Sequence, residues 1–428
     1  MKRRATILML AGFLLATANA GAGWWSAYGH AGLDAAVEQG LAGNPDVVAV
    51  LARIRAADAA LAAARSGRRP EAMVEAGYRT GREQSMRSGG VADDIDPLMA
   101  GTRLSWELDV FGRVGAEVGA ARARLAGRGA EADAVRLMLV RDIVEAYITC
   151  AVLAEEQAWW TRQVGDIRAL RERAARRVEA GLDDPPSLRQ AVAMHEEVEH
   201  HAMEGDIQLD QARARLRSLL GGEDPAIAPT SLGGFTLPSL PELSGANLHV
   251  RRPDVVRAHA DWQAARGEAT QASRDRLPSL ALVVSAAGEG ASASSPDEWS
   301  AWAGPVVSLP LWQPRLRANA AGAMAGVSAA EAEWTAVALR AVLEIDNAWA
   351  ERRRAAEMIG HMAARRDALR AEEESLARRR EAGLIEETDW REGRAAHAEA
   401  ARAHAVWLAN GLRQHAALIA ALGGITPP

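Results

Sequence analysis

The chain has 428 residues and a net charge of only −6, so no strong field points to a nucleic-acid partner. Phe and Tyr number three each, too few for a conventional aromatic core, whereas frequent alanine suits close-packed helices. The length allows two or three ordinary domains or one elongated domain.

The N-terminus has the pattern of a secretory signal peptide over residues 1–20. Lys2-Arg3-Arg4 precedes an apolar stretch from Ile7 to Ala18, and Ala18-Asn19-Ala20 offers a cleavage site of small residues. The alternative is an anchor that stays attached, but the stretch is short for a membrane-spanning helix. We therefore expect export, with cleavage near Ala20.

A first β-hairpin is predicted at about 71–110, after a helix at about 46–66. Apolar and polar residues alternate in both of its strands, as in sheets with one apolar face. The apolar set is Ala72, Val74, Ala76, Tyr78, Leu98, Leu104, Trp106, Leu108 and Val110, and the polar set is Glu71, Glu75, Arg79, Arg103, Ser105, Glu107 and Asp109. A soluble edge hairpin is the alternative, but the strand length and the long polar loop at 81–97 favour membrane strands.

Two long helices follow this hairpin. Proline is absent from 113–180, which predicts one helix on the order of 100 Å long. It ends at Gly181-Leu182, where glycine can adopt the left-handed conformation that stops a helix. A second helix, 187–220, then returns antiparallel to the first. Residues 221–243 are rich in Gly and Pro and are interpreted as a linker.

The chain then repeats itself, so that 21–220 and 244–428 form two structural repeats. Arg252-Pro253-Asp254-Val255-Val256 matches Asn44-Pro45-Asp46-Val47-Val48, and Arg379 to Leu384 matches Arg177 to Leu182. The second repeat comprises a helix at about 254–274, a hairpin at about 278–311 with its loop at 289–298, and long helices at about 315–382 and 388–422. Its first strand keeps the alternation at Leu280, Leu282, Val284 and Ala286, whereas 299–309 is apolar on both faces apart from Ser300, Gly304 and Ser308. The predicted fold is mainly α with a small membrane β part.

Four strands cannot close a membrane barrel, since known barrels begin at roughly eight. Open sheet edges are forbidden in lipid, so several chains must contribute strands. Trp106, Phe111 and Trp312 cluster where strands give way to helices, the level of an aromatic girdle, with ordinary packing as the alternative.

Enzymatic interpretations fit poorly. His195, Glu196, His200 and His201 resemble a zinc-protease motif, but His195 and His200 are five residues apart, so a solvated helix face is favoured. Cys150, the only cysteine, is interpreted as a packing residue and excludes both an intrachain disulfide and a lipid-modified cysteine after the signal. Arginine runs at 352–354 and 378–380 suggest solvated faces, with contact to a partner protein as an alternative for the second. No metal, cofactor or catalytic residue is predicted.

These features together resemble the TolC-like outer-membrane factors, the exit ducts of tripartite efflux pumps and type I secretion systems. The stretch from Leu104 to Arg113 is similar to the strand-to-helix junction of the family, and Val307 to Trp312 to its second copy. A helix-tip signature matches at Arg379, Ala382, Gly383, Leu384 and Asp389. The first copy keeps Arg177, Ala180, Gly181 and Leu182, but has Ser187 in place of the aspartate and an added Pro185-Pro186.

The resemblance implies a homotrimer that forms a 12-stranded β-barrel, continued by a periplasmic α-helical barrel. It implies the outer membrane of a Gram-negative bacterium, with membrane lipid, a periplasmic adaptor and an inner-membrane pump as partners. Many members carry a lipid-anchored N-terminal cysteine, which this chain lacks. The tips, Gly181, Leu182, Gly383 and Leu384, would dock the adaptor, unless they are turn residues only. Asp389 and Glu392 would form a pore constriction, unless they simply stabilise a helix N-terminus.

The predicted function is a passive duct that exports drugs, toxic compounds or metal ions to the exterior. A type I secretion duct is one alternative. An alternative of another class is a soluble periplasmic coiled-coil adaptor or structural protein. An adaptor would have one helical hairpin flanked by small β-domains, not two copies of a hairpin and long helices.

Overall fold

The computed structural model describes residues 23–78, 81–84, 92–95, 98–239, 248–290 and 298–424. The predicted signal peptide, Arg79, 85–91 and 96–97 of the first hairpin loop, 240–243 of the predicted linker and 291–297 of the second hairpin loop lie outside these residues. The second loop was predicted too long, because residues 289, 290 and 298 belong to strands. The chain forms two compact units. Unit 1 comprises Met1–Ala49, Ala132–Pro253 and Ala338–Pro428, and unit 2 comprises Val50–Glu131 and Asp254–Val337. None of the described helices is both long and apolar enough to span a membrane.

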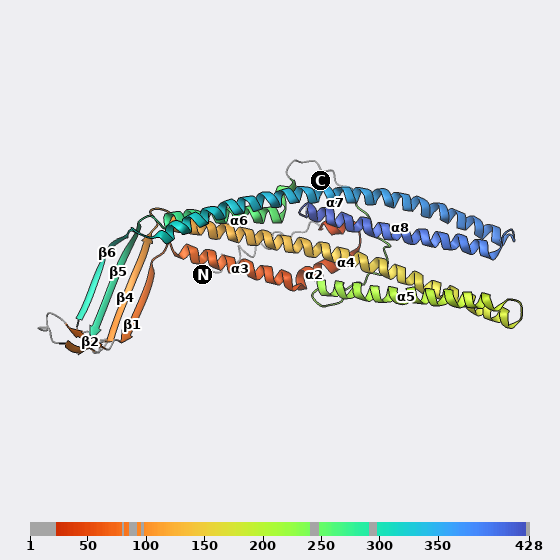
Figure 1. Cartoon of the computed structure of the whole chain (residues 1–428), viewed down its shortest axis with the longest axis horizontal. Helices are drawn as coiled ribbons and strands as arrows, with labels where there is room; N and C mark the ends of the chain where they lie inside the picture. The colour runs from red at the N-terminus through yellow and green to blue at the C-terminus, as the bar shows by residue number, and fades with distance from the viewer. Residues whose placement is uncertain are drawn as a thin grey trace. The chain divides into compact units, whose positions relative to one another are not determined.

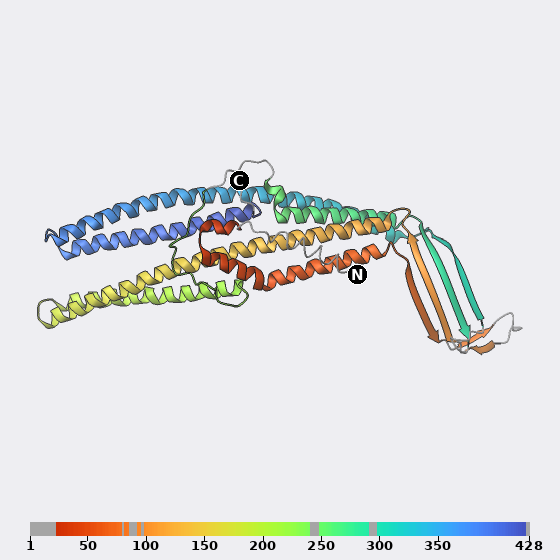
Figure 2. The same ribbon diagram turned by 180° about the vertical axis from the view of Figure 1, so that it is seen from behind.

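The described part of the chain is mainly helical (Figures 1 and 2). Its longer helices come in pairs of matching length. Helices α3 (Pro45–Ser66) and α6 (Pro253–Arg274) have 22 residues each. Helix α4 (Arg113–Glu179) has 67 residues and α7 (Pro314–Glu381) has 68. Helices α5 (Pro185–Leu219) and α8 (Glu387–Ala421) have 35 residues each. The short helices are η1 (Trp24–Tyr28), α2 (Ala31–Gly43) and η3 (Leu248–Arg251).

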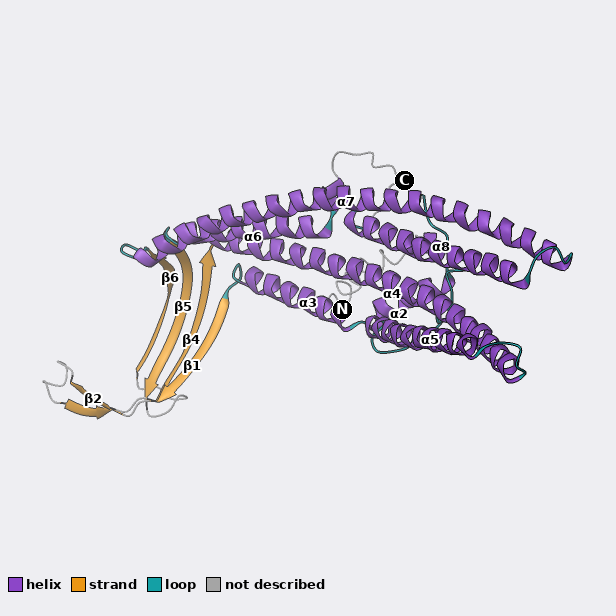
Figure 3. Cartoon of the chain, turned by 45° about the vertical axis from the view of Figure 1, so that its right-hand side comes forward, coloured by secondary structure: helices purple, strands orange, loops and turns teal. Residues whose placement is uncertain are grey.

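Unit 2 contains a four-stranded antiparallel sheet in the order β1-β4-β5-β6 (Figure 3). Its strands are β1 (Glu71–Tyr78), β4 (Leu98–Leu108), β5 (Ser279–Gly290) and β6 (Glu298–Ser308). Pairing of β4 with β5 joins the two hairpins, so β1 and β6 are the edge strands. Strands β2 (Gly81–Gln84) and β3 (Ala92–Ile95) pair within the segment predicted as a polar loop, so that prediction is wrong there.

Small side chains bring the helices of unit 2 close together. Leu61 and Ala64 of α3 pack in one buried cluster with Val114, Val118 and Ala121 of α4. Gly267 of α6 lies so close to α4 that an added Cβ would meet the Ala120 nitrogen at 2.9 Å. Alanine and glycine therefore permit the close contact between helices that the composition suggested.

Unit 1 has a buried polar cluster around Tyr28. This residue is fully buried, and its hydroxyl donates to the Leu412 carbonyl at 3.1 Å and lies 3.0 Å from Nδ1 of His415. Arg352 is only 2 % exposed and donates from Nη2 to the Pro238 carbonyl at 2.7 Å. The interpretation of 352–354 as a solvated face is therefore wrong for Arg352. Burial of its guanidinium is possible because the chain after α5 covers it.

The described part of the predicted linker packs against unit 1. Leu232 and Phe235 are buried, and the Leu232 amide donates to Oε2 of Glu155 at 3.0 Å. The Thr236 amide donates to the Tyr28 carbonyl at 2.8 Å. This segment thus contributes to the core of the unit as well as connecting the two repeats.

We predict that His415 makes stability depend on acidity. Burial, and then the charge of Arg352, lowers the pKa of His415 from 6.5 to about 4. The unfolded chain binds a proton near pH 6.5 that the folded chain cannot bind until about pH 4. Stability is therefore lost as the pH falls through this window, by about 2 kcal/mol at pH 5.

Thermal unfolding of the purified protein at pH 7.5 and pH 5 checks this expectation. His415→Gln should reduce the difference between the two pH values, whereas the control His200→Gln, at an exposed position, should preserve it. Equal losses of stability in the parent and in His415→Gln would contradict the assignment.

Candidate functional site

The register of the sheet places most of its apolar side chains on one face, and the charged side chains lie on the other. Leu104 is opposite Ala72 and Val284, and Val284 is opposite Ala303, so these four residues share a face across all four strands. The remaining members of this face are Val74, Ala76, Tyr78, Leu98, Ala100, Thr102, Trp106, Leu108, Leu280, Leu282, Ala286, Gly288, Trp299, Ala301, Pro305 and Val307. Thr102 is the one polar residue among them. We call this surface the apolar face.

The apolar face is exposed. Val74 is 77 % exposed, Trp299 74 % and Val307 68 %. An exposed apolar surface that extends from one edge strand to the other is typical of contact with lipid or with another chain. The side chains that the sequence placed on one face of β1, β4 and β5 thus lie together, apart from Val110, which follows the end of β4.

The opposite face, which we call the polar face, carries the charged residues of the sheet. Glu71 is opposite Ser105, and Arg103 lies between Met73 and Ser285. Trp302 is opposite Ser285 and therefore belongs to the polar face. The sequence could not place Trp302 because β6 is apolar on both faces.

The three predicted girdle residues lie where strands lead into helices. Trp106 is 37 % exposed and donates from Nε1 to the Arg68 carbonyl at 3.0 Å. Phe111 and Trp312, 45 % and 83 % exposed, lie in the turns after β4 and β6. Trp299 lies at the opposite end of β6 and was not identified from the sequence. Its exposed ring is a further candidate for an interfacial position.

The junction between β4 and α4 is organised by two carboxylates. Arg113 donates to Glu107 through two parallel bonds, Nε to Oε1 at 2.9 Å and Nη2 to Oε2 at 2.7 Å. Asp109 accepts from the amides of Val114 at 3.0 Å and Gly115 at 2.7 Å. The sequence placed Asp109 on the polar face of a strand, but β4 ends at Leu108. Asp109 instead satisfies free amides at the start of α4.

Gly112 makes the turn at this junction. Its φ of +75° is a conformation that side chains with a Cβ disfavour. Its carbonyl accepts from Nη1 of Arg274 at 2.6 Å, which joins the start of α4 to the end of α6. The first repeat therefore depends on an arginine of the second repeat at this point.

The two helical tips share one main-chain geometry. After α4, Gly181 has a φ of +70°, and the Leu182 amide donates to the Arg177 carbonyl at 2.8 Å. After α7, Gly383 has a φ of +69°, and the Leu384 amide donates to the Arg379 carbonyl at 2.9 Å. Both are Schellman C-caps. Leu182 and Leu384 are 66 % and 70 % exposed, so each tip presents a leucine to solvent.

The start of the returning helix differs between the tips. Pro185 and Pro186 open α5, where a missing amide costs little, and Asp184 caps that helix by accepting from the Ser187 amide at 3.3 Å. Asp389 and Glu392 are exposed in the first turns of α8. Trp390 lies between them in sequence, with its ring 3.9 Å from Cζ of Arg380.

Three of the residues that resemble enzymatic groups, His195, His201 and Cys150, take part in helix packing, whereas Glu196 and His200 are exposed. His195 is only 3 % exposed, so the solvated-face interpretation is wrong for it; its Nε2 lies 3.6 Å from Glu199. His201 stacks on Trp160 with a centroid distance of 4.8 Å. Cys150 is buried, and burial raises the pKa of its thiol to about 11. Within the described ranges, no three His, Cys, Asp or Glu residues are grouped so as to hold a metal ion.

Comparison with protein families gives a match over both repeats. The model of the family described as "Outer membrane efflux protein" matches residues 36–222 and 246–424. The fusaric acid resistance protein FusA of Burkholderia cepacia is 30 % identical over 332 residues, 72 % of this chain and 60 % of that protein. The pyoverdine export outer membrane protein OpmQ of Pseudomonas aeruginosa is 24 % identical over 61 % of this chain and 57 % of its own length. The aligned part of the chain thus spans about three fifths of these relatives.

Solved structures share the fold. The outer-membrane channel OprN has a TM-score of 0.78 and 23 % identity, over 95 % of this chain and 93 % of that one. The CmeC outer membrane channel of Campylobacter jejuni has a TM-score of 0.81 and 18 % identity, over 94 % of this chain and 87 % of that one. The mainly helical fold with a small sheet is therefore the fold of these channels.

We predict that Asp109 stabilises the junction through its two accepted hydrogen bonds. Asp109→Ala should lower stability by about 1–2 kcal/mol, because two amides lose their acceptor and a negative charge leaves the start of α4. Asp109→Asn keeps one acceptor oxygen and should lose less. Thermal unfolding followed by circular dichroism measures both variants. An unchanged midpoint for Asp109→Ala would show that the cap contributes nothing.

Proposed function

Because this chain belongs to the outer membrane efflux protein family, we propose that it is the outer-membrane duct of a tripartite efflux system. In this proposal it conducts small molecules from the periplasm to the exterior and performs no chemistry. The sheet lies in the outer membrane, and the long helices continue the duct into the periplasm. The predicted signal peptide directs the chain there.

The observation that carries the proposal is the apolar face between two edge strands. In lipid, every main-chain amide and carbonyl needs a partner within the protein. Strands β1 and β6 each have one neighbour in the sheet, so a single chain leaves an edge on both sides. Pairing β1 of one copy with β6 of the next removes both edges. Three copies, as the family resemblance implies, form a barrel of twelve strands.

The same observation weighs against a soluble periplasmic adaptor or structural protein. Such a protein would expose Val74, Trp299 and Val307 to water without compensation. A type I secretion duct would have the same sheet and remains the alternative within the family. The names of FusA and OpmQ, which concern resistance to an acid and export of pyoverdine, favour small-molecule efflux.

Detergent extraction and fractionation test the membrane placement. The mature protein should be a detergent-dependent trimer in the outer-membrane fraction. Val284→Arg places a charge on the apolar face and should reduce insertion, at a cost of about 2–4 kcal/mol. Ser285→Arg, one residue along β5 on the polar face, is the matched control and should insert normally.

Two results would contradict the proposed function. A monomer in the soluble periplasmic extract, measured by light scattering, would exclude the membrane duct. Deletion of the gene should increase susceptibility to exported compounds, and the cloned gene should restore resistance. Unchanged susceptibility to a panel of organic acids, dyes, antibiotics and metal salts would exclude the efflux role.

We further propose that Gly181, Leu182, Gly383 and Leu384 dock a periplasmic adaptor, which would connect the duct to an inner-membrane pump. Support comes from the exposure of the two leucines, because a Schellman cap more often buries the residue after its glycine against the helix. Both tips present the same backbone shape. One adaptor surface could therefore fit either tip.

The double variant Leu182→Asp and Leu384→Asp should abolish resistance while it leaves the trimer intact, because a charge enters an apolar contact. Drug susceptibility and the size of the detergent complex are the measurements. Met203→Asp, at another exposed apolar position of unit 1, serves as the control and should retain resistance. Parental resistance in the tip variant would count against docking at these leucines.

For Asp389 and Glu392 we propose a periplasmic constriction. Three copies would place six carboxylates around one axis, where they attract cations. Support comes from the exposure of both side chains on consecutive turns of α8. A role limited to the α8 N-terminus is the alternative.

Replacing Asp389 and Glu392 by Ala should change the resting conductance and weaken block by divalent cations. Single-channel recordings in planar bilayers measure both quantities. Glu197→Ala, at an exposed carboxylate within α5, is the control and should behave as the parent. The same conductance and the same block in the double variant would exclude the constriction.

A further inference from the structure

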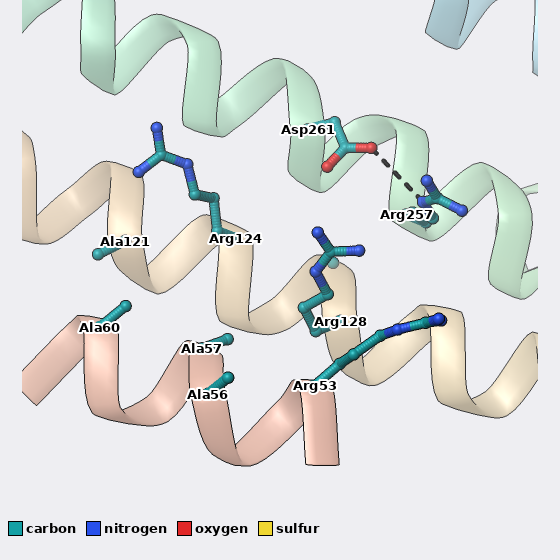
Figure 4. Close-up of a pocket in the computed structure, with 10 residues that line it drawn as sticks. Arg53, Ala56, Ala57, Ala60, Ala121, Arg124, Arg128, Arg257 and Asp261 are labelled. Carbon is teal, nitrogen blue, oxygen red and sulfur yellow. Dashed lines mark ion pairs between the residues drawn. The ribbon is translucent and has the colours of Figure 1, made fainter. Parts of the chain in front are cut away.

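A groove in unit 2 combines a floor of small side chains with a rim of arginines (Figure 4). Helices α3, α4 and α6 form its walls, and its cavity volume is about 470 Å³. Ala56, Ala57, Ala60, Ala121 and Gly127 line it with small groups, and Arg53, Arg124, Arg128 and Arg257 surround it. Asp261 is the one acidic residue among the ten that line it. We call this feature the arginine groove.

The charges around the arginine groove do not balance. Arg53 and Arg128 share one carboxylate, that of Glu131, at 3.2 Å and 2.5 Å. Arg124 is paired with Glu268, and Arg257 lies 3.7 Å from Asp261. Four guanidinium groups therefore face three carboxylates. The pKa of Glu131 is lowered, first by its hydrogen bond from Arg128 and then by the charges of Arg128, Arg257 and Arg53, as expected in a positive potential.

The guanidinium groups retain donors for a further ligand. The four side chains are between 47 % and 57 % exposed. Each guanidinium has five N–H donors, of which a single carboxylate engages at most two. An incoming anion could therefore bind without displacing the existing partners.

Helical periodicity connects the arginine groove to the polar face of the sheet. Arg113, Glu117, Arg124, Arg128 and Glu131 recur every three to four or seven residues and lie on one face of α4. Arg113 pairs with Glu107 of the polar face and with Glu117 at 3.6 Å. A charged stripe thus runs from the polar face to the groove. In the proposed duct the polar face lines the channel, so the groove opens toward the exported molecules.

We propose that the arginine groove binds amphipathic organic anions, namely carboxylates with an aromatic or aliphatic body, on the wall of the duct. The anionic group would be held by guanidinium donors, whose planar geometry suits a carboxylate. The apolar body would lie on the alanine floor, in a cavity of the size that small-molecule sites have. The channel-side position rests on the proposed function, whereas the binding itself does not.

Isothermal titration of the purified full-length protein in detergent tests the proposal. The probe is 1-naphthoate, with the neutral 1-naphthalenemethanol and the cationic 1-naphthylmethylamine as matched probes. The carboxylate should bind at least about tenfold more tightly than either, the effect of one charge-assisted hydrogen bond. Among the three probes, higher salt should weaken the binding of the carboxylate only.

A matched pair of double variants locates the site. Arg53→Gln with Arg124→Gln removes one groove arginine from α3 and one from α4, and should weaken naphthoate binding about tenfold or more. Arg55→Gln with Arg122→Gln removes the same charge from exposed positions of the same helices outside the groove, and should leave it unchanged. Ala56→Phe should weaken binding without a change of charge, because it fills the floor.

Equal binding of the carboxylate and the alcohol would overturn the proposal, as would equal losses in the two double variants. The trimer peak and the circular dichroism spectrum identify any variant that fails to fold, in which case Ala56→Phe decides. Suppose that naphthoate binding depends on Arg53 and Arg124, but deletion of the gene leaves susceptibility unchanged. This outcome would contradict the efflux role and would support the binding site. Normal efflux without naphthoate binding would contradict the site and leave the efflux role standing.

Discussion

The requirement that main-chain hydrogen bonds be satisfied at the sheet edges governs the rest of this structure. The four strands satisfy one another internally, but β1 and β6 end the sheet on either side. With one face apolar and exposed, the sheet is incomplete as a single copy in lipid. In the proposed duct, the pairing with further copies, the barrel and the separation of a lipid face from a channel face all follow from this one constraint. The contacts of Glu107, Asp109 and Arg113 then fix the start of α4 at the end of β4.

Local patterns of the sequence predicted much of this fold, because they depend on short-range physics. Alternation in β4 and β5 identified the two faces, since side chains of a strand point to opposite sides in turn. Absence of proline indicated the long helices, and Gly181 and Gly383 indicated their ends. The mainly helical class with a small sheet agrees with the known channel structures. The domain limits and the roles of Asp389 and Glu392 remain predictions.

Features that depend on distant segments could not be predicted. Arg352 is buried because Pro238 and its neighbours cover it. These residues are far from Arg352 in the sequence, so no local pattern predicts its burial. The spacing of His195 and His200 favours a solvated helix face over a zinc site, but packing against distant residues leaves His195 only 3 % exposed. Asp109 caps α4 and does not lie in a strand, because β4 ends at Leu108, two residues before the predicted end. The arginine groove requires α3, α4 and α6 together, and these come from both repeats.

Close contact between Gly267 and the Ala120 backbone has a consequence for how such a wall can be redesigned. An added methyl at Gly267 would approach main-chain atoms of Ala120 that cannot rotate away. Arg124 and Arg257 are at least half exposed, so their side chains can be exchanged without a shift of either helix. The spacing between α4 and α6 at this contact therefore depends on the lack of a side chain at Gly267 and the small side chain of Ala120. A library of variants should keep Gly267 and Ala120 constant and vary exposed positions such as Arg124 and Arg257. Chemical preference of the wall can then be altered while its width stays the same.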